Sequence, residues 1–247
     1  MDFTENEFFR KLAKSWAKFF SIPLENFLDP EISIIEEPDL KKTNAFNFWT
    51  FDKKRIIQVA PSFYKKILKM NDNNPLEQSI SMEDFISKME SEGFQKDDLI
   101  YIYHLKPGEL KRKPLFDEYT FRFLKLKDQF ILKRLQFACS KFEVKNSWVK
   151  ITHPEVLGCF HGKKLVAVSS MVNFGDAKDI GVLTHPKFRR KGLGRLLISE
   201  LCKKALRKNE LLLYRCHDGN LGSISVARSL GFTKFFEEVT FSARTEK

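Results

Sequence analysis

A basic, glycine-containing segment at residues 185–195 is the part of the sequence best suited to chemistry. It follows a strand-like run that ends at Thr184, and Pro186 stops the hydrogen-bond ladder of that run. A long helix with one apolar face is predicted to begin at about Gly192. The first N–H groups of a helix lack partners within it and carry partial positive charge. Glycine lets a ligand approach such amides closely, so the segment predicts a pyrophosphate site. Four full positive charges strengthen it, on Arg189, Arg190, Lys191 and Arg195.

Two short motifs narrow the choice of pyrophosphate. The sequence has no GxxxxGK[ST] pattern, no third glycine that would complete GxGxxG, and no GxSxG turn. It does have [RQ]xxGx[GA], which begins at Arg189 and ends at Gly194. A second motif starts at Asn220 and ends, after a short predicted helix, in Leu-Gly-Phe. Its glycine, Gly231, stands eleven residues after the asparagine.

The two motifs resemble motifs A and B of the GNAT superfamily of N-acetyltransferases. The order of predicted elements from Glu118 onward is also similar to that superfamily, so the resemblance covers the C-terminal half of the chain. It implies an α+β fold: a GNAT-like central mixed sheet flanked by helices, preceded here by a smaller α+β N-terminal domain. It also implies transfer of an acetyl group from acetyl-CoA to a primary amine of an unidentified acceptor, by direct attack within a ternary complex.

The resemblance further implies where acetyl-CoA binds as co-substrate, without a metal. In GNAT enzymes the strand before motif A separates from its neighbour, and the pantetheine arm pairs with the exposed backbone. Amides there polarise the thioester oxygen. Ser223 either contacts the pantetheine or caps the following helix. The implied cofactor-binding residues are Val182, Leu183, Thr184, Arg189, Arg190, Lys191, Gly192, Leu193, Gly194, Arg195, Asn220 and Ser223.

The catalytic groups depart from the family's pattern. An acceptor amine with a pKa of about 10.4 must lose a proton before it attacks, so a general base is expected near residues 179–184. The positions at which many members of the family carry Glu or His correspond here to Lys178 and Ile180, and neither residue can act as the general base. Asp179 is a candidate base or amine ligand, but it is equally a turn residue. His217 is the other candidate, against a structural or surface role.

The usual general acid is missing as well. The family's tyrosine near the end of motif B maps onto Ala227, so the leaving thiolate takes its proton from water or from a group such as Ser225 or Cys216. A thiolate with a pKa near 8.5 leaves tolerably well without a dedicated acid. A catalytically weak or inactive CoA-binding regulatory module is therefore the alternative function.

The elements that position these residues follow from hydrophobic periodicity and turn signals. In the N-terminal half we expect a helix at 5–20, a hairpin of 46–51 and 55–60, and helices at 61–70 and 81–92, the last capped by Ser81. The aromatic stripes of this half are expected to form core. In the C-terminal half we expect a strand at 119–126, a helix at 128–142, an antiparallel meander of 156–160, 165–174 and 179–184, a helix at 192–208, a strand at 211–216, a helix at 223–230 and a strand at 235–241.

Charge divides the chain into two modules. Residues 1–117 carry a net charge of −2 and residues 118–247 a net charge of +13. We therefore expect an N-terminal α+β module of unknown role at 1–110, which could be a degenerate copy of the same fold, a linker at 104–117, and the GNAT domain at 118–247. The basic half also suits a nucleic-acid binder. It lacks the supporting motifs, however, and an anionic cofactor accounts for much of its charge.

Compartment and partners complete the expectations. No apolar run reaches about 18 residues, and the N-terminus is acidic rather than basic and then apolar. Cys139, Cys159, Cys202 and Cys216 form no CxxC, so we expect free thiols, a cytoplasmic location and no zinc. The expected partners are acetyl-CoA and a small-molecule or protein amine acceptor. Nucleic acid and membrane are not expected, and the protein is expected to be a monomer or homodimer.

Overall fold

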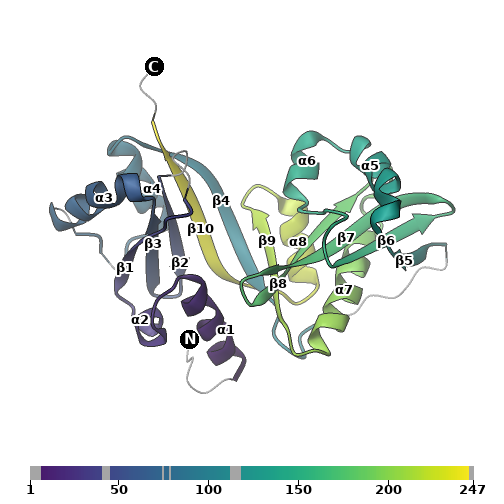
Figure 1. Cartoon of the computed structure of the whole chain (residues 1–247), viewed down its shortest axis with the longest axis horizontal. Coiled ribbons are helices and arrows are strands. Elements are labelled where there is room, and N and C mark those ends of the chain that lie inside the picture. The colour runs from purple at the N-terminus through teal and green to yellow at the C-terminus, as the bar shows by residue number, and fades with distance from the viewer. Residues whose placement is uncertain (1–6, 41–44, 74, 78, 112–117, 245–247) are drawn as a thin grey trace. The chain divides into compact units, whose positions relative to one another are not determined.

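The chain folds into two compact units. The structure, a computed structural model, describes residues 7–40, 45–73, 75–77, 79–111 and 118–244 (Figure 1). Unit 1 comprises Met1–Ile102 and Phe235–Lys247, and unit 2 comprises Tyr103–Lys234. The C-terminal segment therefore belongs to the same unit as the N-terminal part of the chain. Residues 112–117 of the predicted linker, and residues 5 and 6 of the first predicted helix, lie outside the described residues.

The sheet of unit 1 is built mainly from antiparallel pairs. Its strands follow the order β1-β3-β2-β10-β4. Strands β2 and β3 form the predicted hairpin, β1 runs parallel to β3, and β10 runs antiparallel to β2 with Phe241 opposite Phe46. The bounds are β1 (Ile32–Glu36), β2 (Phe46–Phe51), β3 (Lys54–Val59), β4 (Phe94–His104) and β10 (Thr233–Ala243).

Aromatic side chains fill both sides of this sheet. Because side chains alternate along a strand, Phe46 and Phe48 of β2 point to one face, where Phe48 stacks on Phe85 with ring centroids 3.6 Å apart. Trp49 points to the other face and contacts Trp16 at 5.7 Å. These stripes form core, as predicted. The helices are α1 (Glu7–Phe19), α2 (Leu24–Leu28), α3 (Pro61–Asn73) and α4 (Met82–Ser91).

Unit 2 contains the predicted meander. Strands β5 to β8 pair antiparallel in sequence order, and β9 lies parallel to β8. The parallel pair requires a crossover, and the helix α7 that follows the glycine-containing segment provides it. The bounds are β5 (Thr120–Phe123), β6 (Glu155–His161), β7 (Lys164–Phe174), β8 (Ala177–Thr184) and β9 (Leu211–His217).

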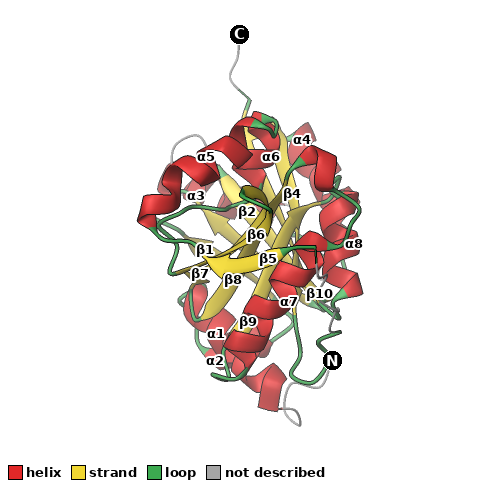
Figure 2. Ribbon diagram, turned by 90° about the vertical axis from the view of Figure 1, so that its right-hand side faces the viewer, coloured by secondary structure: helices red, strands yellow, loops and turns green. Residues whose placement is uncertain are grey.

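Helices cover both faces of this second sheet (Figures 1 and 2). Gly181 of β8 faces the segment after α6, whereas Val182 faces the start of α7. Thus α5 and α6 lie on one face, and α7 lies on the other. The bounds are η1 (Leu126–Asp128), α5 (Gln129–Phe137), α6 (Lys141–Asn146), η2 (Pro186–Phe188), α7 (Leu193–Leu206) and α8 (Leu221–Ser229).

Some boundaries differ from the predicted ones. The single helix expected at 128–142 is wrong, because the chain breaks after Phe137 and Ser140 begins a new helix through a capping box with Glu143. The helix from Pro61 extends to Asn73, past its predicted end at residue 70. Strands β1 and β4 and helix α2 were not predicted. The cap at Ser81 is confirmed, since its side chain accepts the N–H of Asp84 at 3.0 Å.

Candidate functional site

The start of α7 offers a row of unsatisfied amides. Gly192 is its N-cap residue, with φ 80° and no side-chain cap, and Arg190 also has a positive φ of 61°. These conformations turn the chain sharply before the helix. Within the part of the chain that the structure describes, the N–H groups of residues 190–195 donate to no protein acceptor. Orphan amides at a helix N-terminus are the groups that bind phosphate oxygens.

A close contact fixes these amides beside β8. A Cβ atom added to Gly194 would lie 3.3 Å from Cγ2 of Val182 and 3.5 Å from Oγ1 of Thr184. The missing side chain therefore lets the first turn of α7 rest directly on the end of β8. The two glycines of the motif do different work, because Gly192 supplies a left-handed turn and Gly194 supplies proximity.

Beside this turn, β8 and β9 stop pairing. Their register runs from Ala177 opposite Leu211 to Asp179 opposite Leu213 and ends there among the described residues. On its other edge β8 remains paired with β7 as far as Thr184. The predicted residues Val182, Leu183 and Thr184 therefore lie where β8 has one neighbour rather than two. The structure brings this unpaired stretch and the α7 amides together.

The second motif has a structural role that the sequence left open. Asn220 caps α8, with its Oδ1 accepting the N–H of Ser223 at 3.1 Å. The N-cap alternative for Ser223 is thus wrong, because that place belongs to Asn220. Burial raises the pKa of Tyr214, and the Ser223 side chain opposes that effect in part. Gly231 is required by its backbone: its φ is 96°, and an added Cβ would lie 2.2 Å from the carbonyl oxygen of Glu109.

Only some of the basic side chains of the first motif interact with other groups of the protein. Arg189 forms an ion pair with Glu143 at 2.7 Å, and its Nε donates to the carbonyl oxygen of Thr184 at 3.2 Å. Lys191 lies 5.5 Å from the ring centroid of Phe188. No ion pair of Arg190 or Arg195 is found in the described part of the chain. The loop therefore retains positive charge for an anion.

The surroundings of His185 are also positively charged. It is buried at the start of the loop, and its pKa is lowered, first by burial and then by the charges of Lys164, Lys187 and Arg189. A cation is therefore disfavoured at this point. The residues present fit a diphosphate: free amides, a glycine turn without Cβ and surplus positive charge.

The two catalytic candidates have different surroundings. Asp179 is buried, and its Oδ2 accepts Nε of Arg215 at 3.1 Å and Nη2 at 2.8 Å. His217 lies at the end of β9, with Nε2 3.1 Å from Oδ1 of Asn146 and its ring beside Phe142. Asp179 is therefore part of an ion pair, while His217 is held by a neutral amide.

The alternative proton donors differ as well. Ala227 is fully buried in α8, so no side chain from this position reaches the site. Burial raises the pKa of Cys216 to about 12. Ser225 is exposed on α8. A thiol with so high a pKa is a weak proton donor, so Ser225 and water remain the predicted donors.

Sequence reasoning missed the side chains that surround the end of β8 and β9. The carbonyl oxygen of Ser147 would lie 2.1 Å from a Cβ on Gly181, so the segment after α6 rests directly on β8. Next to it, Trp148 stacks on Arg215. The one available signal was Gly181 itself, a glycine inside a strand, which marks a close backbone approach.

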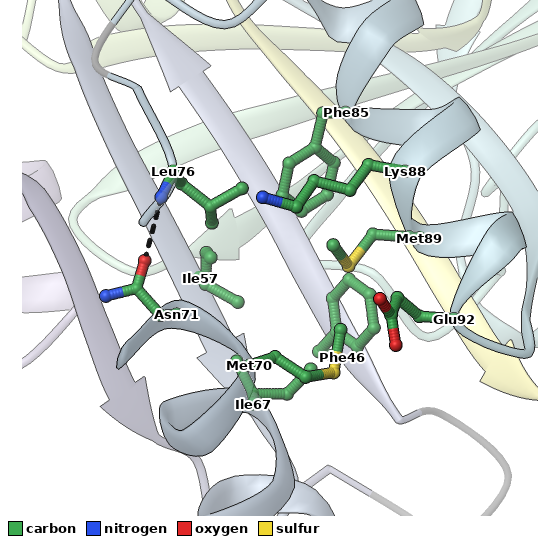
Figure 3. A pocket seen from close by; sticks show the side chains of 10 residues that line it. All are labelled: Phe46, Ile57, Ile67, Met70, Asn71, Leu76, Phe85, Lys88, Met89 and Glu92. Carbon is green, nitrogen blue, oxygen red and sulfur yellow. Dashed lines mark hydrogen bonds between the residues drawn. The ribbon is translucent and has the colours of Figure 1, made fainter. Parts of the chain in front are cut away.

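A pocket of about 370 Å³, a figure that includes space open to solvent, lies in unit 1 (Figure 3). Its wall is mostly apolar, with Phe46, Met70 and Phe85 among the lining residues, and Lys88 and Glu92 at its polar side. None of the predicted site residues lines it. The pocket is therefore separate from the predicted diphosphate site.

The described residues contain no group of three or more His, Cys, Asp or Glu side chains arranged to hold a metal ion. None of their helices has both the length and the apolar character needed to cross a bilayer. The four cysteines are free thiols.

Comparisons with known proteins concern the family and the fold. The sequence model of the family described as GNAT acetyltransferase matches residues 124–240. No curated protein sequence matches the chain. An acetyltransferase of the GNAT family from Colwellia psychrerythraea is 14% identical, with a TM-score of 0.52 over 76% of this chain and 76% of that one. A GCN5-related N-acetyltransferase from Sphaerobacter thermophilus is 13% identical, with a TM-score of 0.50 over 79% and 75% of the two chains.

A Drosophila protein of known structure is similar over a comparable length. It is 16% identical, with a TM-score of 0.51 over 81% of this chain and 75% of that one. At such low identities the three structures establish a shared fold alone.

Proposed function

Because residues 124–240 match the GNAT acetyltransferase family model, we propose that the protein transfers an acetyl group from acetyl-CoA to a primary amine. The single observation that carries the proposal is the row of free amides at residues 190–195, placed against an unpaired stretch of β8. The free amides suit the diphosphate of the co-substrate, and the unpaired backbone of β8 suits its pantetheine arm, which carries amide groups. A cytoplasmic location agrees with the four free thiols.

The residues divide the work of binding. The amides of residues 190–195, with Arg190 and Arg195, would hold the diphosphate of the co-substrate. The backbone of residues 182–184, where β8 is not paired with β9, would pair with its pantetheine arm and would bring the thioester near the point where the two strands separate. When bound, the co-substrate supplies an activated acyl carbon and a thiol leaving group.

The reaction balances without a further reactant. The acceptor nitrogen attacks the thioester carbon, a C–N bond forms and the C–S bond breaks. The nitrogen loses one proton, and the departing sulfur gains one to become a free thiol. We propose His217 rather than Asp179 as the proton acceptor, because Oδ2 of Asp179 already accepts two hydrogen bonds from Arg215.

Paired variants separate binding from chemistry. Gly192→Asp places a carboxylate where the diphosphate is expected, whereas Gly192→Asn places a neutral side chain of the same shape there and shares the same backbone strain. We expect calorimetry to show CoA binding weakened by Gly192→Asp at least about tenfold more than by Gly192→Asn.

His217→Gln should bind CoA normally and lose about 10²-fold or more of product formation, measured by mass spectrometry on a panel of amines.

Each of these experiments has a result that would contradict the proposal. Equal CoA affinity of the two Gly192 variants would remove the diphosphate from the start of α7. CoA binding by the wild type without acyl transfer to any amine would favour the alternative function, a CoA-binding regulatory module, to which the buried Ala227 also points. Thermal melting of every variant checks that it is folded.

A further inference from the structure

A charged pair framed by aromatic rings lies where β8 and β9 separate. Asp179 is the last residue of β8 that is paired with β9, and Arg215 lies two residues beyond the corresponding position on β9. Their ion pair is 2.8 Å long, and only 14% of the Arg215 side chain and 5% of the Asp179 side chain are exposed. The pair therefore stands at the proposed position of the thioester.

The pair leaves hydrogen-bonding capacity on both partners. A guanidinium has five N–H donors, and Arg215 uses Nε and Nη2 on a single oxygen, Oδ2 of Asp179. Among the described residues, Nη1 of Arg215 has no acceptor and Oδ1 of Asp179 has no donor. An adjacent donor and acceptor of opposite charge thus remain available to a ligand.

Two aromatic rings hold the guanidinium in place. The Arg215 Cζ lies 4.2 Å from the ring centroid of Phe174 and 5.0 Å from that of Trp148. Such contacts favour a desolvated guanidinium plane. A fixed plane loses little entropy on binding a second carboxylate, and it presents its outer edge in the geometry that matches one.

We propose that Arg215 and Asp179 recognise the carboxylate and the amine of a free α-amino acid, which makes amino acids the acceptor class. This inference rests on the proposed acyl transfer. The carboxylate binds Nη1 and the outer hydrogen of Nη2, and the neighbouring amine donates to Oδ1 of Asp179. The +13 net charge of residues 118–247 attracts an acceptor with a carboxylate more strongly than a polycation. The product is an N-acyl amino acid, with free CoA thiol as the second product.

The acceptor series isolates the carboxylate. Each of several amino acids is compared with its amide and with the amine that lacks the carboxyl group, under saturating acetyl-CoA. We expect kcat/KM to be at least about tenfold higher for the free amino acid, because the two analogues leave the Arg215 donors unpaired. Arg215→Lys, which keeps the charge but loses the fork, should raise KM for amino acids about tenfold without changing KM for acetyl-CoA.

Fluorescence provides a readout that does not depend on transfer. Trp148 contacts Arg215, whereas Trp16 and Trp49 are buried in unit 1. Amino acids should therefore change the emission of Trp148 in the wild type, and Trp148→Phe should abolish the change. Lys178→Gln serves as control, because Lys178 is a nearby cation of β8 that pairs with Glu210 at 3.4 Å. It should leave the preference intact.

The possible results are distinct. Amines that lack the carboxylate and are acylated as well as amino acids would overturn the inference while leaving acyl transfer in place. A Trp148 response to amino acids that is lost in Arg215→Lys, without product from any acceptor, would support the inference and count against the proposed function. A wild type that shows neither response nor preference would overturn the inference.

Discussion

His104 links pH to stability through one buried side chain. It is completely buried in β4, and its Nδ1 lies 2.8 Å from the carbonyl oxygen of Leu212. A carbonyl oxygen only accepts, so Nδ1 carries the hydrogen of a neutral ring. Burial lowers the pKa of this imidazole to about 3, and the hydrogen bond to Leu212 opposes that effect only in part.

The direction of the pH effect follows from this shift. Between pH 6.5 and about 3 the unfolded chain binds a proton at His104 that the folded chain does not bind. The contribution of His104 is therefore fully present above pH 6.5 and is lost as the pH falls, by about 2 kcal/mol at pH 5. Urea titrations at pH 7.5 and pH 5 measure the loss in the wild type and in His104→Gln. Equal losses in the two proteins would contradict the assignment.

At the level of single residues, residue type and spacing could predict only those features of the candidate site that depend on backbone conformation. Gly192 and Gly194 could be predicted because a glycine's conformational freedom is a property of the residue itself. The pairing of Asp179 with Arg215, 36 positions later, could not, because only the register of β8 and β9 brings them together. For the same reason the sequence did not reveal that Asn146 holds His217.

Strand β8 and the segment after α6 approach each other closely at Gly181. The ideal Cβ of Gly181 would lie 2.1 Å from the carbonyl oxygen of Ser147 and 3.2 Å from the carbonyl carbon of Trp148. Neither contact is to a flexible side chain that could swing away. The position of the 147–148 segment, and with it that of the Trp148 ring, is thus set by the absence of one methyl group.

Gly181→Ala should therefore disturb a whole segment. We expect the free energy of unfolding to fall by about 1–3 kcal/mol and the emission of Trp148 to shift as its backbone moves. Thermal or urea unfolding followed by fluorescence measures both effects. Gly219→Ala is the matched control, since a Cβ at Gly219 meets nothing within 4 Å. If the two variants behave alike, the close approach has no energetic weight.

The elements with strong hydrophobic periodicity or clear turn signals were predicted, and the others were missed. The apolar face of α7 and the hairpin of β2 and β3 gave unambiguous patterns. Strand β4 begins with a run that includes Lys96, Asp97 and Asp98, which carries no strand signal of its own. It becomes a strand through pairing within the sheet, a tertiary effect that overrides local propensity. The break between α5 and α6 was missed because apolar spacing continues across it.

For the molecule as a whole, the last strand belongs to the first unit. Residues 237–241 of β10 pair antiparallel with β2, and Phe241 stacks on Phe46 with ring centroids 4.6 Å apart. The net charge divides the sequence near residue 118, and it could not reveal that the last strand returns to the first unit. A strand's partner is not encoded in its own composition, so the limits of 110 and 118 remain a prediction.

Phe241 tests how much unit 1 depends on this strand. Phe241→Ala removes a fully buried ring from the core and should lower the stability of unit 1 by about 3–5 kcal/mol. Ser242→Ala loses only an exposed hydrogen bond to Asp97 and should cost less than about 1 kcal/mol. Urea unfolding followed by the fluorescence of Trp16 and Trp49 reports on unit 1. Similar midpoints for the two variants would show that β10 contributes little to that core.

Strand β10 also sets an order of events during synthesis. The ribosome releases β2 and its hairpin partner β3 well before β10, so β2 lacks its second neighbour while all of unit 2 is being made. During that interval Phe46 and Phe48 lack part of their cover, and unit 1 offers an apolar strand edge to any chaperone or nascent chain nearby. Unit 2 has all its strands earlier, so the half of the polypeptide that emerges first is the last to be completed.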